Sequence, residues 1–203
     1  PQISFNSENS ICFDIPFTVQ NASLPYLSGD SIVSYKWNFG DSSGIVSAFQ
    51  PNPHHYGSEG SFSVSLTGTD INGCKDSMNR TVIVRPKPFV WIIPKNKSYC
   101  QGNSNRMIAY TSDQLNWSAS LSGLSLCPPC DTNQVNPPHS TTFYATSTNE
   151  FNCVSIDSSY IRIMEPFSAS TDIPYTSVCE AAESQLSVSP AEKNWPEKRF
   201  GWC

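Results

Sequence analysis

The chain is poor in charged side chains, which make up only 14 % of its 203 residues. Acidic residues outnumber basic ones by 17 to 12, so the sequence lacks the basic excess that marks nucleic-acid-binding proteins. It also lacks a long apolar segment, because the longest run, Phe89–Ile93, is far too short to cross a bilayer. No basic start followed by an apolar stretch opens the chain, so we expect any signal peptide to lie outside this sequence. We therefore expect no nucleic-acid partner and no membrane insertion of this segment.

The residues that are abundant indicate a folded, exported protein. Hydrophobic residues reach 38 % and aromatic residues 12 %, which is enough to build a core. Eight cysteines and sixteen prolines in a background rich in Ser and Thr predict an oxidising, extracellular setting. Apolar and polar residues alternate along Ser61–Thr67, Thr81–Val84 and Ser158–Ile163, the period of half-buried strands, and Asn72-Gly73 is a tight-turn signal. No stretch shows a convincing helical period, so an all-β fold is predicted.

A repeat of about 80 residues organises the chain. Cys74 and Cys153 are 79 positions apart, and Cys100 and Cys179 have the same spacing. The tryptophans follow nearly the same period, at Trp37, Trp117 and Trp195. Short strands at this density predict tandem β-sandwich modules. We assign two complete modules to residues 1–86 and 87–165 and the start of a third, truncated module to residues 166–203, with Pro-rich junctions as short stiff linkers.

The cysteines predict three disulfides. An 80-residue module has a marginal core, and a bridge from Cys12 to Cys74 would stabilise it by about 4 kcal/mol. Cys100 and Cys153 occupy corresponding places in the second module, so we expect them to pair in the same way. Cys127-Pro128-Pro129-Cys130 has the spacing of a zinc or redox site, but its module supplies no second pair of ligands, and a small structural disulfide is favoured. The partners of Cys179 and Cys203 stay open.

Residues 1–86 contain a set of motifs in a characteristic order. Tyr35-Lys36-Trp37-Asn38-Phe39-Gly40-Asp41 is followed by His54-His55-Tyr56, by the strand Gly60–Thr67 and by Asp70-Ile71-Asn72-Gly73-Cys74. This order resembles the PKD domain, an Ig-like β-sandwich. The chain departs from the family at Ser42-Ser43-Gly44, where a glycine usually follows the aspartate directly, so this turn is expected to be longer.

The later modules resemble Ig-like repeats of large Bacteroidetes surface proteins. The resemblance rests on Tyr99–Gly102, Leu115–Trp117, Cys127–Cys130, Asn136-Pro137, Thr141–Tyr144 and Phe151–Cys153. It implies a gliding-motility adhesin or other type IX secretion cargo at the cell surface, in which non-enzymatic modules act as an extended stalk or as adhesive units. Their partners would be neighbouring repeats and a surface glycan or protein. The alternative is an accessory or polysaccharide-binding spacer of a secreted hydrolase, and a pure spacer without a ligand is a third possibility.

Candidate site residues are few, and most have a structural interpretation. Trp37, Trp117 and Trp195 are expected to be the buried tryptophans of Ig-like sheets rather than sugar platforms, whereas Trp91 and Trp202 fall outside that register and are better candidates for exposed contacts. His54 is expected to support a turn, and neither it nor His55 or His139 completes a catalytic set.

Two further kinds of site are weaker hypotheses. The carboxylates of Asp41 and Asp70 are the candidates for Ca²⁺, which some PKD domains bind and which needs six to eight oxygen ligands. No other cofactor is expected. Ser31 and Ser77 follow an aspartate and precede an apolar residue, the pattern that Bacteroidetes use for O-glycosylation. Sugar on these two serines is therefore predicted from the family resemblance.

Overall fold

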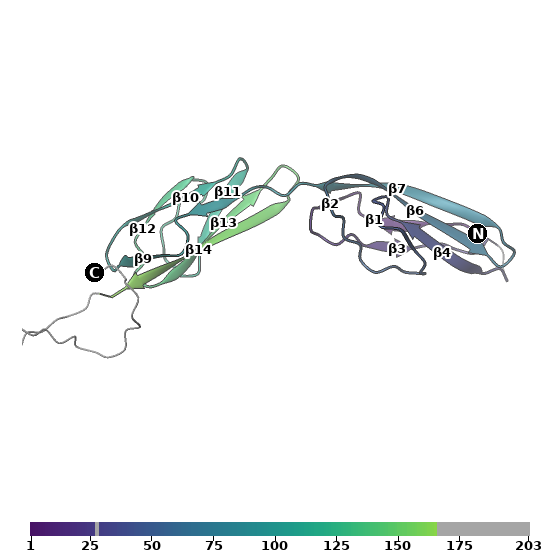
Figure 1. The fold of residues 1–203 in the computed structure, drawn as a ribbon, viewed down its shortest axis with the longest axis horizontal. Coiled ribbons are helices and arrows are strands. Elements are labelled where there is room, and N and C mark those ends of the chain that lie inside the picture. Colours follow the sequence, from purple (N-terminus) through teal and green to yellow (C-terminus); the bar gives the residue numbers. More distant parts are fainter. Residues whose placement is uncertain (27–28, 166–203) are drawn as a thin grey trace, which may run out of the picture. The chain divides into compact units, whose positions relative to one another are not determined.

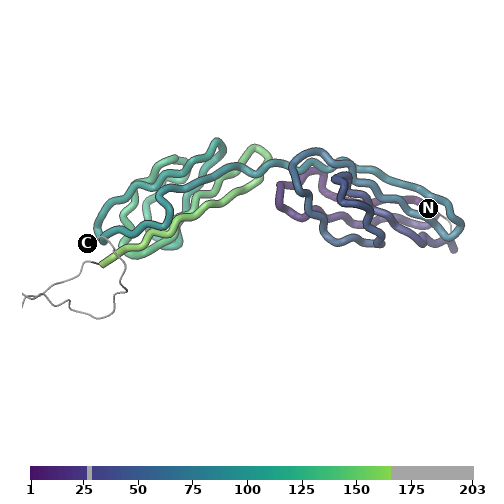
Figure 2. The backbone as a smooth tube through the Cα atoms, viewed as in Figure 1, coloured from purple at the N-terminus to yellow at the C-terminus, as the bar shows by residue number. Residues whose placement is uncertain are grey.

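The structure is a computed structural model that describes residues 1–26 and 29–165. The regular secondary structure within these residues consists of β-strands, which confirms the predicted all-β class (Figure 1). No described helix is long and apolar enough to cross a membrane. The chain divides into two compact units, each a β-sandwich, whose course can be followed in Figure 2. The predicted third module, with Cys179, Trp195, Trp202 and Cys203, lies outside the described residues.

The first unit contains Pro1–Phe89 and also Ser147–Ser155. Its strands form a two-stranded sheet, β1-β3, and a five-stranded sheet in the order β2-β7-β6-β4-β5. The bounds are β1 (Phe5–Ser7), β2 (Ser10–Cys12), β3 (Val19–Asn21), β4 (Ile32–Asn38), β5 (Ile45–Val46), β6 (Gly60–Asp70) and β7 (Lys75–Arg85). Residues 147–155, which the repeat assigns to the second module, therefore pack with the first unit.

Strand β6, whose sequence alternates between apolar and polar residues, is the central strand of this sheet. Val64 and Leu66 are fully buried, while Ser63 and Ser65, which alternate with them, face away from the core. The Asn72-Gly73 turn joins β6 to β7 as expected, and Gly73 takes a φ of 82°, a left-handed conformation that glycine adopts without strain. Trp37 of β4 is completely buried against Phe5 of β1, edge to face, with ring centroids 5.2 Å apart.

The second unit contains Val90–Thr146 and the described residues from Ile156 onward. Its two sheets have the orders β12-β10-β8 and β11-β13-β14-β9. The bounds are β8 (Trp91–Ile93), β9 (Lys97–Cys100), β10 (Asn105–Tyr110), β11 (Gln114–Ala119), β12 (Thr132–Val135), β13 (Thr141–Thr148) and β14 (Val154–Met164). The core gathers Ile92, Met107, Trp117, Phe143 and Ile161.

The two units share one construction. In each, a short early strand pairs in parallel with the last strand: β2 with β7, and β9 with β14. Cys12 lies opposite Arg85 and Cys100 lies opposite Met164. Arg85 and Met164 are again 79 residues apart. Trp37 and Trp117 are both buried, as predicted, and each indole N–H donates to a backbone carbonyl, that of Ala48 at 3.0 Å and that of Cys130 at 2.8 Å.

Candidate functional site

The feature that the sequence least foretold is a disulfide between Cys12 and Cys153, two residues 141 positions apart. Cys12 ends β2, and Cys153 lies directly before β14, in the segment Ser147–Ser155 that belongs to the first unit. Their Cα atoms are 5.5 Å apart, within the normal range for a disulfide. Cys153 has no exposed surface. The bond closes a covalent loop that contains most of the described chain.

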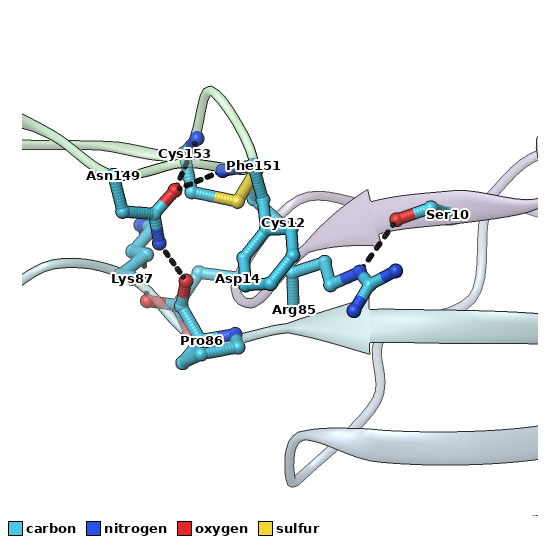
Figure 3. The surroundings of a disulfide bond; sticks show 9 residues. All are labelled: Ser10, Cys12, Asp14, Arg85, Pro86, Lys87, Asn149, Phe151 and Cys153. Carbon is cyan, nitrogen blue, oxygen red and sulfur yellow. Dashed lines mark hydrogen bonds and ion pairs between the residues drawn. A yellow bond between two sulfur atoms is a disulfide. The ribbon is translucent and has the colours of Figure 1, made fainter.

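Polar and aromatic contacts surround the disulfide (Figure 3). The guanidinium of Arg85 lies over the Phe151 ring, 4.2 Å from its centroid, and its Nε donates to Ser10 Oγ at 3.3 Å. The side-chain amide of Asn149 donates to the Pro86 carbonyl at 2.9 Å. These contacts hold residues 149–153 against β2 and the end of β7 in addition to the covalent bond.

Asn149 also fixes the turn that presents Cys153. Its Oδ1 accepts backbone N–H groups from Phe151 at 3.1 Å and from Cys153 at 3.0 Å. Asn152 takes a φ of 61°, a left-handed value that asparagine tolerates better than most residues. The turn after β6 is built in the same way, because Asp70 Oδ1 accepts the N–H groups of Asn72 and Cys74, both at 2.9 Å.

Both of the long-range pairings predicted from the sequence, Cys12–Cys74 and Cys100–Cys153, are wrong. Cys12 lies opposite Arg85, at the far end of β7, whereas Cys74 lies just before the start of that strand. The 11 residues of β7 hold them roughly 35 Å apart, far beyond the span of a disulfide. Cys100 and Cys153 are separated by β14 in the same manner.

The remaining described cysteines have different states. Cys127 and Cys130 form the predicted disulfide, and the Asn133 side chain accepts from Cys127 N and donates to Cys127 O. Cys100 is also disulfide-bonded. Cys74 is a free thiol on the surface of the described part of the chain.

His54 and Asp41 form a second polar cluster in the first unit. His54 Nε2 lies 2.6 Å from Asp41 Oδ2, and the imidazole stacks on the Phe39 ring with centroids 4.1 Å apart. Burial alone would raise the Asp41 pKa, but hydrogen bonds from Ser43 and His54 outweigh it and hold the pKa below its usual value. Burial, assisted by the negative charge of Asp41, raises the pKa of Tyr56. The backbone of His54 pairs with Phe17, so the residue supports the fold at this turn.

The structure does not bring the two candidate calcium ligands together. Asp70 pairs with Ile32 at one end of β4, while Asp41 follows Asn38 at the other end. Seven residues of strand separate them, roughly 20 Å, so they cannot share one ion. Asp70 is 5 % exposed and is occupied by the turn that it caps. Among residues 1–26 and 29–165, no three His, Cys, Asp or Glu side chains are grouped as metal ligands.

Two aspartates that stabilise the fold were not predicted from the sequence. Asp76 Oδ2 accepts the N–H of Ile3 at 2.9 Å, and Asp157 Oδ2 accepts the N–H of Ile92 at 2.7 Å. Each carboxylate thus ties the first segment of its unit to the last strand. Asp157 also pairs with Lys95. Backbone hydrogen bonds lower the pKa of Asp76, while for Asp157 bonds from Lys95, Ile92 and Ser158 outweigh burial and lower the pKa too. The 81-residue spacing of the Asp-Ser dipeptides was the available signal.

The other predicted positions lie on the surface. Ser31 and Ser77 are exposed, and the backbone N–H of each donates to the side chain of the aspartate before it, Asp30 and Asp76. Their glycosylation stays a prediction. Trp91 is 49 % exposed, as expected, with the Lys95 ammonium 5.2 Å from the centroid of its ring. His55 and His139 are exposed.

Comparison with known proteins identifies a family that the first unit matches. Residues 1–85 match the family model of the PKD domain. A segment of 82 residues is 39 % identical to a microbial collagenase of Vibrio alginolyticus, a match that covers 40 % of this chain and 10 % of that protein.

Solved structures with similar folds include two that span about 80 % of this chain. The fibronectin(III)-like modules of Clostridium thermocellum CbhA are 11 % identical, with 80 % of this chain and 95 % of that one covered and a TM-score of 0.36. Murine CEACAM1b is also 11 % identical, with 80 % and 100 % covered and a TM-score of 0.32. The fold assignment itself rests on the strands described above: the chain is a tandem of β-sandwich units whose first 85 residues match the PKD domain, an extracellular and typically non-catalytic module.

Proposed function

We propose that this chain is a non-enzymatic spacer segment of a larger extracellular repeat protein of the cell-surface adhesin type. The observation that carries the proposal is that both units repeat the same construction. Both units contain a parallel pair, β2–β7 or β9–β14, a capped turn, at Asp70 or Asn149, and an aspartate tie. The later elements of these features recur at 79 to 81 residues, while the early strands Ser10–Cys12 and Lys97–Cys100 end 88 residues apart. A chain that repeats a module in this way suits an array that sets a distal binding surface apart from the cell.

A second candidate is an accessory segment of a secreted hydrolase. The observation that favours it is the match of an 82-residue segment of this chain to the microbial collagenase. In that role the chain would hold a polymeric substrate near a separate catalytic domain. The reaction and the substrate would belong to that domain, and the chain would contribute binding or spacing.

Binding to insoluble polymers separates the two candidates. The purified 203-residue chain is mixed with fibrillar collagen or with chitin, sedimented, and quantified in the pellet. A spacer segment stays in the supernatant at all concentrations, as an unrelated β-sandwich does. Saturable binding to either polymer would contradict the spacer function and support the accessory role. In that case a Trp91→Ala variant tests whether the exposed indole contributes to the binding.

A further inference from the structure

The connectivity of the Cys12–Cys153 disulfide determines how the chain carries tension. A force applied to the two ends follows the shortest covalent route between them. That route runs from residue 1 to Cys12, through the disulfide to Cys153, and on toward the C-terminus. Residues 13–152 form a closed loop beside this route, so tension along the backbone bypasses them.

Most of both hydrophobic cores belongs to the bypassed loop. In the first unit, the buried core residues outside it are Ile3, Phe5 and Ile11. In the second unit, Ile161 is the buried core residue outside it. The central strands β4, β6, β10 and β13 all lie inside. The strands that tension reaches directly are β1 and β2 on one side of the disulfide and β14 on the other.

The surroundings of the disulfide enclose one of its two cysteines. Reduction requires a thiolate to reach one of the two sulfurs. Cys153 has no exposed surface, and the Arg85 guanidinium over Phe151 and the Asn149 bond to Pro86 hold its turn in place. These contacts enclose the Cys153 side of the disulfide, whereas Cys12 is partly exposed.

We infer that the Cys12–Cys153 disulfide is a mechanical shunt that limits how far this segment can be stretched, even after both units unfold. The loop removes 141 residue steps, or about 480 Å of extended chain at roughly 3.4 Å per residue. The 203-residue chain then extends to about 210 Å instead of about 690 Å. The use of such a tether by the cell rests on the proposed spacer function, whereas the shunt itself does not.

Single-molecule stretching of the full chain tests the shunt, with handles at its two ends. Cys100 takes part in another disulfide, so the comparison is made in a Cys100→Ser background. In one variant the shunt is intact, and in the other Cys12→Ser and Cys153→Ser remove it. Non-reducing peptide mapping verifies the pairing in both samples before stretching.

The expected result is a final contour length of about 210 Å with the shunt and about 480 Å more without it. Equal contour lengths would overturn the inference. An intermediate gain of about 390 Å on full reduction of the unmodified chain would also overturn it, because that value belongs to the pairings Cys12–Cys74 and Cys100–Cys153. The polymer-binding assay has no bearing on contour length, so failure of the shunt and failure of the spacer function are distinguishable.

Discussion

Removal of the Cys12–Cys153 disulfide should lower the stability of the chain far more than removal of the Cys127–Cys130 disulfide. Both changes replace two cysteines by serines, but the loops differ greatly, because the first closes over 141 positions and the second over 3. In the chain-entropy treatment, a disulfide stabilises the fold by restricting the unfolded chain, and the effect grows with the logarithm of the loop length. The treatment gives about 5 kcal/mol for the long loop and about 2 kcal/mol for the short one.

The noncovalent contacts around Cys12 decide how closely the measurement should follow this estimate. The Arg85–Phe151 contact and the Asn149–Pro86 hydrogen bond do not depend on the sulfur atoms, so they stay available in the variant. The loss should therefore arise mainly in the unfolded state. Since a serine pair leaves a gap at a fully buried position, packing at Cys153 adds to the loss and does not reduce it.

Equilibrium unfolding in urea, followed by tryptophan fluorescence, measures both variants. The free energies of all transitions are summed, since the two units can unfold separately. Cys74→Ser is included in every sample, the reference included, so that the free thiol cannot exchange with the others. Equal losses for the two disulfides, or a larger loss for Cys127→Ser/Cys130→Ser, would refute the argument from loop length.

Three further predictions concern single residues. Gly40→Ala should lower the stability of the fold by about 2–4 kcal/mol, whereas Gly44→Ala should lower it by about 1 kcal/mol. Both glycines have positive φ, but a Cβ at Gly40 would lie 2.6 Å from a backbone oxygen, while one at Gly44 meets nothing within 4 Å. Thermal unfolding of the two variants compares them. Asp157→Asn should lower the free energy of unfolding by about 1–2 kcal/mol at pH 7, because the variant has no carboxylate to pair with Lys95. The Asp157 pKa is lowered in the fold, so this stabilisation is present above the unfolded pKa near 4 and disappears as the pH falls below it. The stabilities of the unmodified chain and the variant should therefore converge toward pH 2. A stability difference that stays constant with pH would contradict the assignment. Cys74 should react with iodoacetamide in the folded chain, and a native mass without the added group would show that it is not free.

Local patterns in the sequence predicted the strands well. Alternation placed Val64 and Leu66 on the buried face, because a strand turns successive side chains to opposite sides whatever it pairs with. The repeat placed Trp37 and Trp117 in the two cores for a similar reason, since equivalent strands bury equivalent positions. The Asn72-Gly73 turn followed from the conformational freedom of glycine. Each of these predictions depends on interactions within a few residues.

The disulfides could not be predicted in this way. Repeat spacing shows that Cys74 and Cys153 are equivalent, but it does not show at which end of a strand each lies relative to Cys12. That information comes from the parallel register of β2 on β7, which places Cys12 beside Arg85. The aspartate ties depend on the same kind of long-range placement, because Asp76 and Ile3 are 73 residues apart.

The participation of Ser147–Ser155 in the first unit affects the order in which this protein is assembled. Cys12 is synthesised before its partner, which follows 141 residues later, roughly 7–30 s at ordinary rates of translation. Until then the first unit lacks a segment that contributes to its packing as well as its covalent closure. The boundary at residue 85 that sequence comparison assigns to the PKD domain therefore differs from the boundary of the structural unit, and a fragment cut there would leave Cys12 without its partner.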